Sequence, residues 1–232
     1  MRKLPAGRRF LATLPLAAAL VAHGALPRDA FAAETPRMAM AAERVQAKAP
    51  GGSLHREQRL KRIEAFKRSG KRKDVARLMP MLKDPDGHVR REAEDAIWLL
   101  WGRSGDAQVD RLFRAGVGEM DRGEVNQAIE LFTRVVDLAP TFAEAWNKRA
   151  TARFVAGDLA GAMDDCERAL ALLPDHFGSL AGYGHIYFRL NDLDMAIRYW
   201  ERALAVNPNL SSVARSIEAA EKLLLRRGRL RT

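Results

Sequence analysis

The residues that could support catalysis are few and lie far apart in this sequence. Cys166 is the single cysteine among 232 residues, so it has no thiol partner for a disulfide or a CxxC metal site. The five histidines are scattered, and the adjacent carboxylates Asp164 and Asp165 would diverge on a helix instead of meeting as an acid–base pair. The sequence also lacks a Gly-rich phosphate loop and the HExxH and GxSxG motifs. These features predict a chain that is not an enzyme and needs no metal or cofactor.

The amino terminus is typical of an export signal. Arg8 and Arg9 precede an apolar run, and the small residues around Ala32 and Ala33 follow it. That run holds about a dozen residues, fewer than the roughly 20 needed to span a bilayer as a helix. We therefore expect a signal peptide over residues 1–33, cleaved near its end, and a periplasmic or secreted protein. The arginine pair leaves both general secretion and twin-arginine export open.

Composition favours a folded helical protein whose basic charge lies at its flanks. The chain is 47% hydrophobic, 29% charged and only 7% aromatic, which favours packed helices over disorder or sheets. Residues 34–73 carry 12 Lys and Arg against 4 Asp and Glu, whereas residues 74–225 carry 18 against 24. Because the main body is mildly acidic, the net charge of +10 does not indicate a nucleic-acid partner.

A 34-residue period runs through the second half of the sequence. Pro140, Pro174 and Pro208 are spaced 34 residues apart, and other landmarks keep the same register. They are Gly123, Gly157 and Asn191; the acidic Glu124, Asp158 and Asp192; the small Ala128, Ala162 and Ala196; and the larger Phe132, Cys166 and Trp200. A sustained period of this length is the sequence signature of a repeat protein.

Each repeat predicts two helices that are joined by a tight turn and ended by proline. Gly and Asn accept the positive φ of a helix C′ position, so Gly123, Gly157 and Asn191 mark the turns. The acidic residue that follows each of them can accept amide hydrogens at the start of the second helix. The alanine lets the two helices approach closely, and the larger residue fills the seam between them. Cys166 is therefore expected in the core, without a role as a nucleophile.

These landmarks resemble those of the tetratricopeptide repeat (TPR) family. The third unit fits the family pattern best, with Leu180, Tyr183, Gly184, Tyr187, Ala196, Trp200, Ala203 and Pro208. The second unit departs from the pattern at Arg149, Arg153 and Cys166, and the first unit departs at Glu119. The resemblance implies an all-α helical-hairpin solenoid, with three TPR units over residues 106–208, a capping helix over 209–226 and a basic tail over 227–232.

The stretch before the repeats resembles, more weakly, a HEAT repeat around residues 72–101. We expect a HEAT-like helical hairpin region over residues 54–105 that stacks on the first TPR unit. Trp98 and Trp101 would be buried at that junction. Residues 34–53 combine glycine, proline, alanine and lone charges without a periodic apolar face, so they are expected to form a flexible linker.

The TPR resemblance also implies where a protein or peptide partner would bind. Stacked units curve so that their first helices line a concave surface, which usually holds a peptide or a partner's helix. In that register the candidate partner-binding residues are Phe113, Arg114, Val117, Glu144, Asn147, Lys148, Thr151, Phe154, His185, Phe188 and Arg189. We expect the aromatic rings to pack on an apolar ligand, and Lys148 and Arg189 to meet a carboxylate. The chain lacks the residues of the carboxylate-clamp subfamily at Phe113, Val117, Gly178 and Gly182, so that ligand class is not expected.

The basic segment 54–73 offers an alternative function. Leu60, Ile63 and Phe66 form a thin apolar stripe on a helix crowded with arginine and lysine, as in a helix that lies on an anionic membrane or envelope polymer. The interpretation that we favour is that the stripe packs on the next helix while the charges stay solvated. The sequence names neither the partner nor the oligomeric state.

Overall fold

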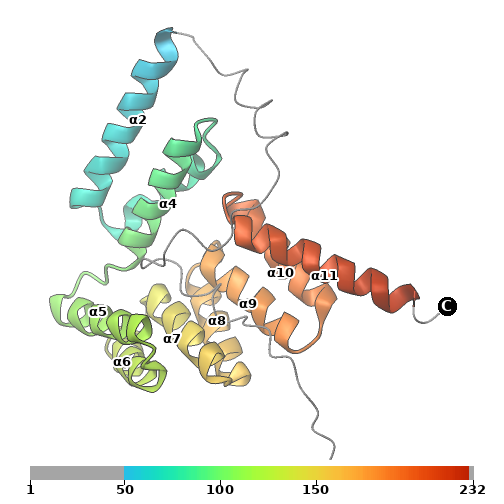
Figure 1. Cartoon of the computed structure of the whole chain (residues 1–232). Coiled ribbons are helices and arrows are strands. Elements are labelled where there is room, and N and C mark those ends of the chain that lie inside the picture. The colour runs from blue at the N-terminus through green and yellow to red at the C-terminus, as the bar shows by residue number, and fades with distance from the viewer. Residues whose placement is uncertain (1–49, 230–232) are drawn as a thin grey trace, which may run out of the picture.

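The computed structural model describes residues 50–229, and this part of the chain is helical, without a strand (Figure 1). The expected signal peptide, residues 34–49 of the expected linker and residues 230–232 lie outside the described residues. The expected all-α class is confirmed. The helices are α2 (Pro50–Ser69), η2 (Arg72–Asp74), α3 (Val75–Leu78), η3 (Met79–Lys83), α4 (Gly87–Trp101), α5 (Ala107–Arg122), α6 (Val125–Leu138), α7 (Ala143–Ala156), α8 (Leu159–Leu172), α9 (Phe177–Arg189), α10 (Leu193–Val206) and α11 (Ser211–Arg229).

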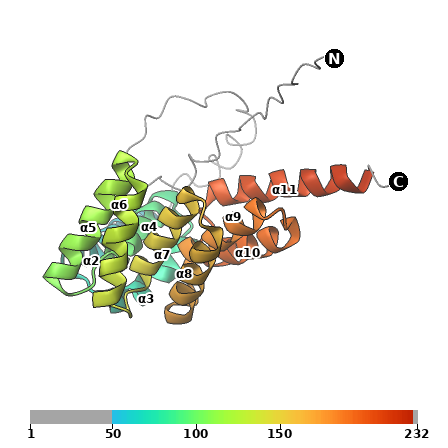
Figure 2. The ribbon, with the colours of Figure 1, turned by 90° about the horizontal axis from the view of Figure 1, so that it is seen from below.

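Three helix pairs follow the 34-residue period: α5 with α6, α7 with α8, and α9 with α10. The turn inside each pair has the left-handed backbone that the sequence predicts, with φ of 80° at Gly123, 89° at Gly157 and 66° at Asn191. Helix α11 packs on α10 and extends beyond it, so it closes one end of the array (Figure 2).

The predicted acidic caps form in two of the three pairs. Asp158 accepts a hydrogen bond from the amide of Gly161 at 2.9 Å, and Asp192 accepts one from Met195 at 3.1 Å. Glu124 makes no such bond at the start of α6. A glutamate side chain is one methylene longer than aspartate and is not among the preferred N-cap residues, so the register alone was not enough to predict the cap.

The seam inside each pair depends on matched residue sizes. Gly116 faces Phe132, and a Cβ on this glycine would lie 2.7 Å from the phenyl ring. Gly184 faces Trp200, and a Cβ there would lie 2.3 Å from the indole. The middle pair carries Ala150 at the position of these glycines, opposite the smaller Cys166. A larger residue on one helix is thus offset by a smaller one on its partner.

The two arginines that depart from the TPR pattern form one buried ion-pair network. Arg149 donates two hydrogen bonds to Asp165, at 2.9 and 2.7 Å, and Arg153 donates a third at 2.9 Å. Asp165 is 1% exposed and Arg149 7%. The side chain of Arg149 also lies 4.8 Å from the ring centroid of Trp146. The network joins α7 to α8 by charge where the other pairs use apolar or aromatic residues.

Residues 50–101 form an N-terminal unit in which α2 packs on α4. Its core includes Ile63, Leu78, Leu82 and Leu100, all 0% exposed. The segment 72–83 is not one continuous helix, because it divides into η2, α3 and η3. Pro80 lies within η3, and a proline lacks the amide hydrogen that an α-helix would need there. The HEAT-like resemblance stays a prediction.

The N-terminal unit does not stack on the first helix pair, and this expectation was wrong. Trp101 stacks on His176 with ring centroids 4.2 Å apart, and Trp98 meets Phe177 edge-on at 4.9 Å. Gly178 makes this contact close, since a Cβ there would lie 2.6 Å from the Trp98 ring. The two tryptophans do lie at a junction, but the junction is with the start of α9, in the third pair (Figure 1).

Polar contacts reach from the N-terminal unit even further along the chain. Asn209, just before α11, donates to the carbonyl of Leu82 at 3.2 Å and accepts from the Arg90 guanidinium at 2.9 Å. Phe177 belongs to the core of the N-terminal unit, and Leu210 packs against that core. The N-terminal unit and the third pair therefore share one core.

Candidate functional site

The predicted partner-binding residues divide into an accessible group and a buried group. Arg114 and Arg189 are exposed. Val117, Lys148, Thr151, His185 and Phe188 are partly exposed. The buried residues are Phe113, Glu144, Asn147 and Phe154, each at most 6% exposed. Only part of the predicted surface is therefore open to a ligand.

Phe113 lies in the core of the first pair. Its ring centroid is 5.0 Å from Phe142 and 5.8 Å from Phe132, and Gly102 lies directly beside it. The expectation that this ring packs on an apolar ligand is not met, because the chain itself surrounds the ring. Sequence register placed the residue on the inner face but could not show that the loop after α4 covers it.

Glu144 and Asn147 belong to a buried polar network between α7 and α9. The carboxylate of Glu144 lies 2.9 Å from His176 Nε2 and accepts from Asn147 Nδ2 at 3.0 Å. The Asn147 side-chain oxygen accepts from the Ser179 hydroxyl at 3.1 Å. Burial would raise the pKa of Glu144, but the nearby Lys148, His176 and Asn147 outweigh burial and lower it. Glu144 is therefore ionised, and its hydrogen-bond capacity is largely used within the protein.

The chain Ser179–His176–Glu144 has the residue types of a nucleophile, a base and an orienting acid, yet its geometry serves structure. His176 Nδ1 accepts the backbone amide of Ser179 at 3.1 Å, which makes the histidine the N-cap of α9. His176 and Ser179 are both 0% exposed, and Trp101 stacks on the imidazole. A substrate has no access to this hydroxyl. His176 was not among the predicted site residues, although its place just before a predicted helix is that of a cap.

The N-terminal unit covers one end of the inner surface. The Lys148 ammonium lies 3.4 Å from Glu144 and 5.4 Å from the ring centroid of Trp98. Trp98 also touches Gly178, at the start of α9. Lys148 is therefore engaged within the protein and is less available to a ligand carboxylate than we expected.

The open part of the surface lies along the second halves of α7 and α9. Thr151 and Phe154 border a small hollow there together with Gly182 and Ile186. The Arg189 guanidinium lies 5.2 Å above the Phe154 ring and is exposed. The structure thus places Arg189 over Phe154, and because the phenyl ring is buried, the accessible groups here are Thr151 and the Arg189 guanidinium.

His185 and Phe188 continue this open part toward α10. The rings of both residues lie near Trp200, with centroids 5.3 and 5.7 Å away. Burial lowers the pKa of His185 to about 4, so the ring is neutral at neutral pH. A neutral imidazole here contributes packing and hydrogen bonding without charge.

Cys166 lies in the helix seam, as predicted. It is 1% exposed, and burial, with a smaller effect of Asp165, raises the pKa of its thiol to about 12. A thiol in this state is a poor nucleophile at neutral pH. Among residues 50–229, no group of His, Cys, Asp and Glu side chains is arranged to hold a metal ion.

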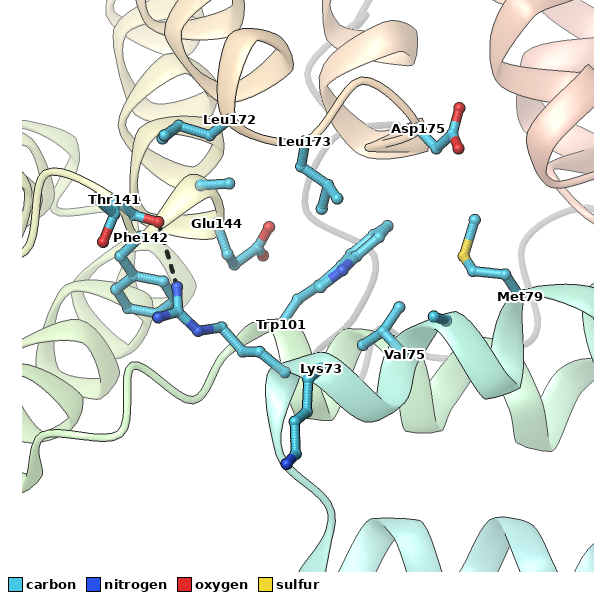
Figure 3. Close-up of a pocket in the computed structure, with 13 residues that line it drawn as sticks. Lys73, Val75, Met79, Trp101, Thr141, Phe142, Glu144, Leu172, Leu173 and Asp175 are labelled. Carbon is cyan, nitrogen blue, oxygen red and sulfur yellow. Dashed lines mark hydrogen bonds between the residues drawn. The ribbon is translucent and has the colours of Figure 1, made fainter.

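A cavity of about 560 Å³ lies where the N-terminal unit meets the repeats (Figure 3). It is lined by Arg72, Lys73, Val75, Ala76, Met79, Trp101, Thr141, Phe142, Ala143, Glu144, Leu172, Leu173 and Asp175. The sequence does not predict this cavity, because its lining comes from four separate stretches of the chain whose packing the sequence does not reveal.

The apolar stripe of α2 is covered by its own unit. Ile63 is 0% exposed, and Leu60 and Phe66 pack against the same core. The helix also pairs several of its cations, since Arg56 lies 2.9 Å from Asp86 and Arg59 lies 2.9 Å from Asp84. The stripe therefore packs on its own unit, which is the interpretation that we favoured. None of the helices in residues 50–229 has the length and apolar character to cross a bilayer.

Comparison with known families and proteins agrees with the helix pairs. Tetratricopeptide repeat family models match residues 113–177 and 184–210. A TPR repeat-containing protein from Rhizobium etli is 31% identical over 126 residues, which is 54% of this chain and 61% of that protein. Tetratricopeptide repeat protein 36 from Bos taurus is 48% identical over 52 residues, which is 22% of this chain and 28% of that protein. The chain thus spans about three fifths of the first relative and under a third of the second.

Solved structures show the same fold. The Sgt2 TPR domain from Aspergillus fumigatus superposes with a TM-score of 0.51 at 24% identity, over 53% of this chain and 83% of that domain. The first TPR domain of Spaghetti (RPAP3), bound to an HSP90 peptide, superposes with a TM-score of 0.50 at 26% identity, over 52% of this chain and 96% of that domain. Family models and relatives together confirm the tetratricopeptide repeats predicted from the sequence.

Proposed function

Because the chain contains tetratricopeptide repeats, we propose that it is a non-catalytic scaffold that binds a peptide or a partner's helix on the inner surface of the repeats. The observation that carries this proposal is the open stretch along α7 and α9, where Arg189 stands exposed above Phe154. A structural neighbour that matches 52% of this chain is bound to a peptide, which supports the same mode of binding.

The open stretch favours a partner segment with apolar and acidic residues. Thr151 and Phe188 offer packing area and one hydroxyl, whereas Arg189 offers a guanidinium that can meet a carboxylate in a bidentate pair. Lys148 contributes less, because Glu144 and Trp98 already engage its ammonium. The binding surface is therefore shorter than the full inner face of three repeats.

The test is capture of a partner by the mature protein with a charge reversal at Arg189. Crosslinking and pull-down from an envelope extract is run with the parent, with Arg189→Glu and with Arg198→Glu. Arg198 is an exposed arginine on α10, the second helix of the same pair, so it controls for the charge change alone. We expect Arg189→Glu to lose a protein that the parent and Arg198→Glu retain. Equal capture by all three variants would remove the groove from the proposal.

We also propose that the protein acts outside the cytoplasm, after removal of about the first 33 residues. The support is the order of charges, apolar run and small residues at the amino terminus. Fusing residues 1–33 to alkaline phosphatase tests export, and the mass of the mature chain locates the cleavage site. Replacing Arg8 and Arg9 by lysine decides between the two export routes, since only twin-arginine transport requires that pair. An inactive fusion would refute export.

A further inference from the structure

The cavity at the junction belongs to neither unit alone. Its walls come from the segment 72–79 and Trp101 in the N-terminal unit, and from the segments 141–144 and 172–175 in the repeats. Its volume of about 560 Å³ lies within the range of about 300–1,000 Å³ that is usual for pockets holding a whole small molecule. The cavity therefore has room for a ligand larger than a single amino-acid side chain.

Most of the cavity wall is apolar. The apolar side chains are those of Val75, Ala76, Met79, Trp101, Phe142, Ala143, Leu172 and Leu173. Among the described residues that line the cavity, Thr141 alone has an uncharged polar side chain. A sugar or a nucleobase would leave most of its polar groups unpaired against such a wall, which costs free energy. The wall therefore favours a hydrocarbon group as the body of the ligand.

The two carboxylates of the lining differ in accessibility. Glu144 is 3% exposed, and its carboxylate is already paired, 2.9 Å from His176 Nε2 and 3.4 Å from the Lys148 ammonium. Asp175 is exposed and lies on the side of the cavity away from Phe142 (Figure 3). The charge of Glu144 is thus balanced within the protein, and Asp175 is the accessible carboxylate of the lining.

The accessible cations lie on the side of Phe142. Arg72 is partly exposed, donates to the carbonyls of Thr141 and Ser104 at 3.3 Å each, and has its guanidinium 5.4 Å from the Phe142 ring centroid. A guanidinium has five N–H donors, and these two bonds use two of them, so three remain for a ligand. The exposed Lys73 is the next residue of the lining.

The chain around these two cations adds to the positive charge. The segment 71–77 carries Lys71, Arg72, Lys73 and Arg77 against the single acidic residue Asp74. Asp74 accepts the backbone amide of Lys71 at 2.8 Å and lies 3.7 Å from the Arg77 guanidinium. The rim of the cavity beside Phe142 is therefore positive, and it attracts an anion.

We propose that the cavity binds an amphiphile that has one hydrocarbon chain and an anionic head group, a carboxylate or a phosphate. The chain packs along the apolar wall toward Leu173 and Met79, and the head group accepts charge-assisted hydrogen bonds from Arg72. The flexible side chain of Lys73 can turn toward the same head group. A cationic head group would meet two like charges there, so the rim discriminates by charge. This inference goes beyond the proposed function and does not depend on it.

The probe is dodecanoate, observed at the methyl group of Met79. The mature protein is labelled with ¹³C-methyl methionine, and the signal of Met79, a partly exposed residue of the lining, is assigned with Met79→Leu. Dodecyl phosphate and dodecyltrimethylammonium are titrated beside dodecanoate, all below the concentration at which micelles form. We expect an anion to shift the Met79 signal and the cation to bind about tenfold more weakly.

Each outcome of this titration bears on the proposal. The anion that binds more tightly identifies the head group as a carboxylate or a phosphate. Binding of the cation as tight as that of both anions would overturn the proposal, as would a Met79 signal that none of the three compounds moves.

A blocked leucine–glutamate dipeptide tests whether the cavity holds a partner's side chain instead. It offers a negative charge beside an apolar group much shorter than a dodecyl chain. We expect it to bind at least about 100-fold more weakly than dodecanoate, because it buries fewer methylenes. If the dipeptide binds as tightly as dodecanoate, the cavity is a peptide pocket and the amphiphile is refuted.

Two pairs of variants tie the signal to the cavity and to its charge. Ala76→Trp fills the cavity from an exposed lining position and should abolish binding, whereas Ala65→Trp, at an exposed position of α2 outside the lining, should preserve it. Arg72→Gln should weaken dodecanoate about fivefold without weakening the cation, a change of preference that loosening of the junction alone would not produce. Arg77→Gln, at an exposed arginine outside the lining, should have a smaller effect. Binding that survives Ala76→Trp would place the ligand elsewhere and refute the site.

The two proposals fail separately. Arg189 lies outside the cavity lining, so Arg189→Glu is expected to leave dodecanoate binding unchanged. If dodecanoate and dodecyl phosphate do not bind while Arg189-dependent capture persists, only the cavity inference falls. If they bind and Arg189→Glu has no effect on capture, the groove falls and the cavity stands.

Discussion

Removing the carboxylate of Asp165 should destabilise the middle repeat more than any exposed substitution in the same helix. Asp165 accepts three hydrogen bonds from Arg149 and Arg153, and Asp165→Ala leaves the Arg149 guanidinium buried without its partner. Loss of one member of a buried ion pair costs about 3–5 kcal/mol. In a chain of this size that corresponds to a fall of about 6–20 °C in Tm.

The assay is urea unfolding followed by circular dichroism, with Asp164→Ala as the control. Asp164 is exposed and adjacent, so its loss should change the free energy of unfolding by no more than about 0.5 kcal/mol. Replacing Arg149 and Asp165 together by leucine removes the charge and its partner, and should recover most of the stability. A loss below about 1 kcal/mol in Asp165→Ala would refute the argument that the network carries the α7–α8 contact.

Three further outcomes follow from the packing and the pKa shift. Gly184→Ala should lower the free energy of unfolding by about 1–3 kcal/mol, because its Cβ would lie 2.3 Å from the Trp200 ring. Gly182→Ala, whose Cβ would lie 3.3 Å from the Cys166 thiol, should lower it less in the same urea assay. Burial lowers the pKa of His185 from 6.5 to about 4, so the unfolded chain binds the proton more readily than the folded chain. The free energy of unfolding should therefore fall as the pH drops from 6.5 toward 4, by at most about 1.4 kcal/mol per pH unit. His185→Gln should show a smaller fall between pH 6.5 and pH 4.5, and an unchanged slope would contradict the assignment. Trp101→Ala should lower the free energy of unfolding by about 3–5 kcal/mol, since it opens the shared core, and a loss under 1 kcal/mol would show that the junction is weak.

The period of the sequence predicted the repeats well because their landmarks are local. Gly123, Gly157 and Asn191 need a positive φ for reasons internal to one turn, and the structure has it at all three. The burial of Cys166 followed from the same register. A local backbone requirement that recurs three times at a fixed spacing can be recognised in a single sequence.

The candidate site was predicted less well because its accessibility depends on distant contacts. Phe113 occupies an inner-face position, but the loop near Gly102 covers it. Lys148 occupies another inner-face position, but the Trp98 ring lies near its ammonium group. The register of a repeat fixes where a side chain points, whereas the packing of a second unit decides what it meets. No periodic pattern links residues 98 and 178, so the junction and its cavity could not be predicted.

The bonds from Asn209 to Leu82 and Arg90 affect how the chain reaches its native state. In a simple repeat array each unit contacts only its neighbours, so folding can spread from any point and the ends open independently. Here residues separated by 119 and 127 positions must meet before the shared core closes. Such distant contacts slow folding, and they couple the two ends of the array into one cooperative transition. A ribosome must release the chain past residue 177 before Trp101 can meet His176 and Phe177, and past residue 210 before the N-terminal unit can complete its core.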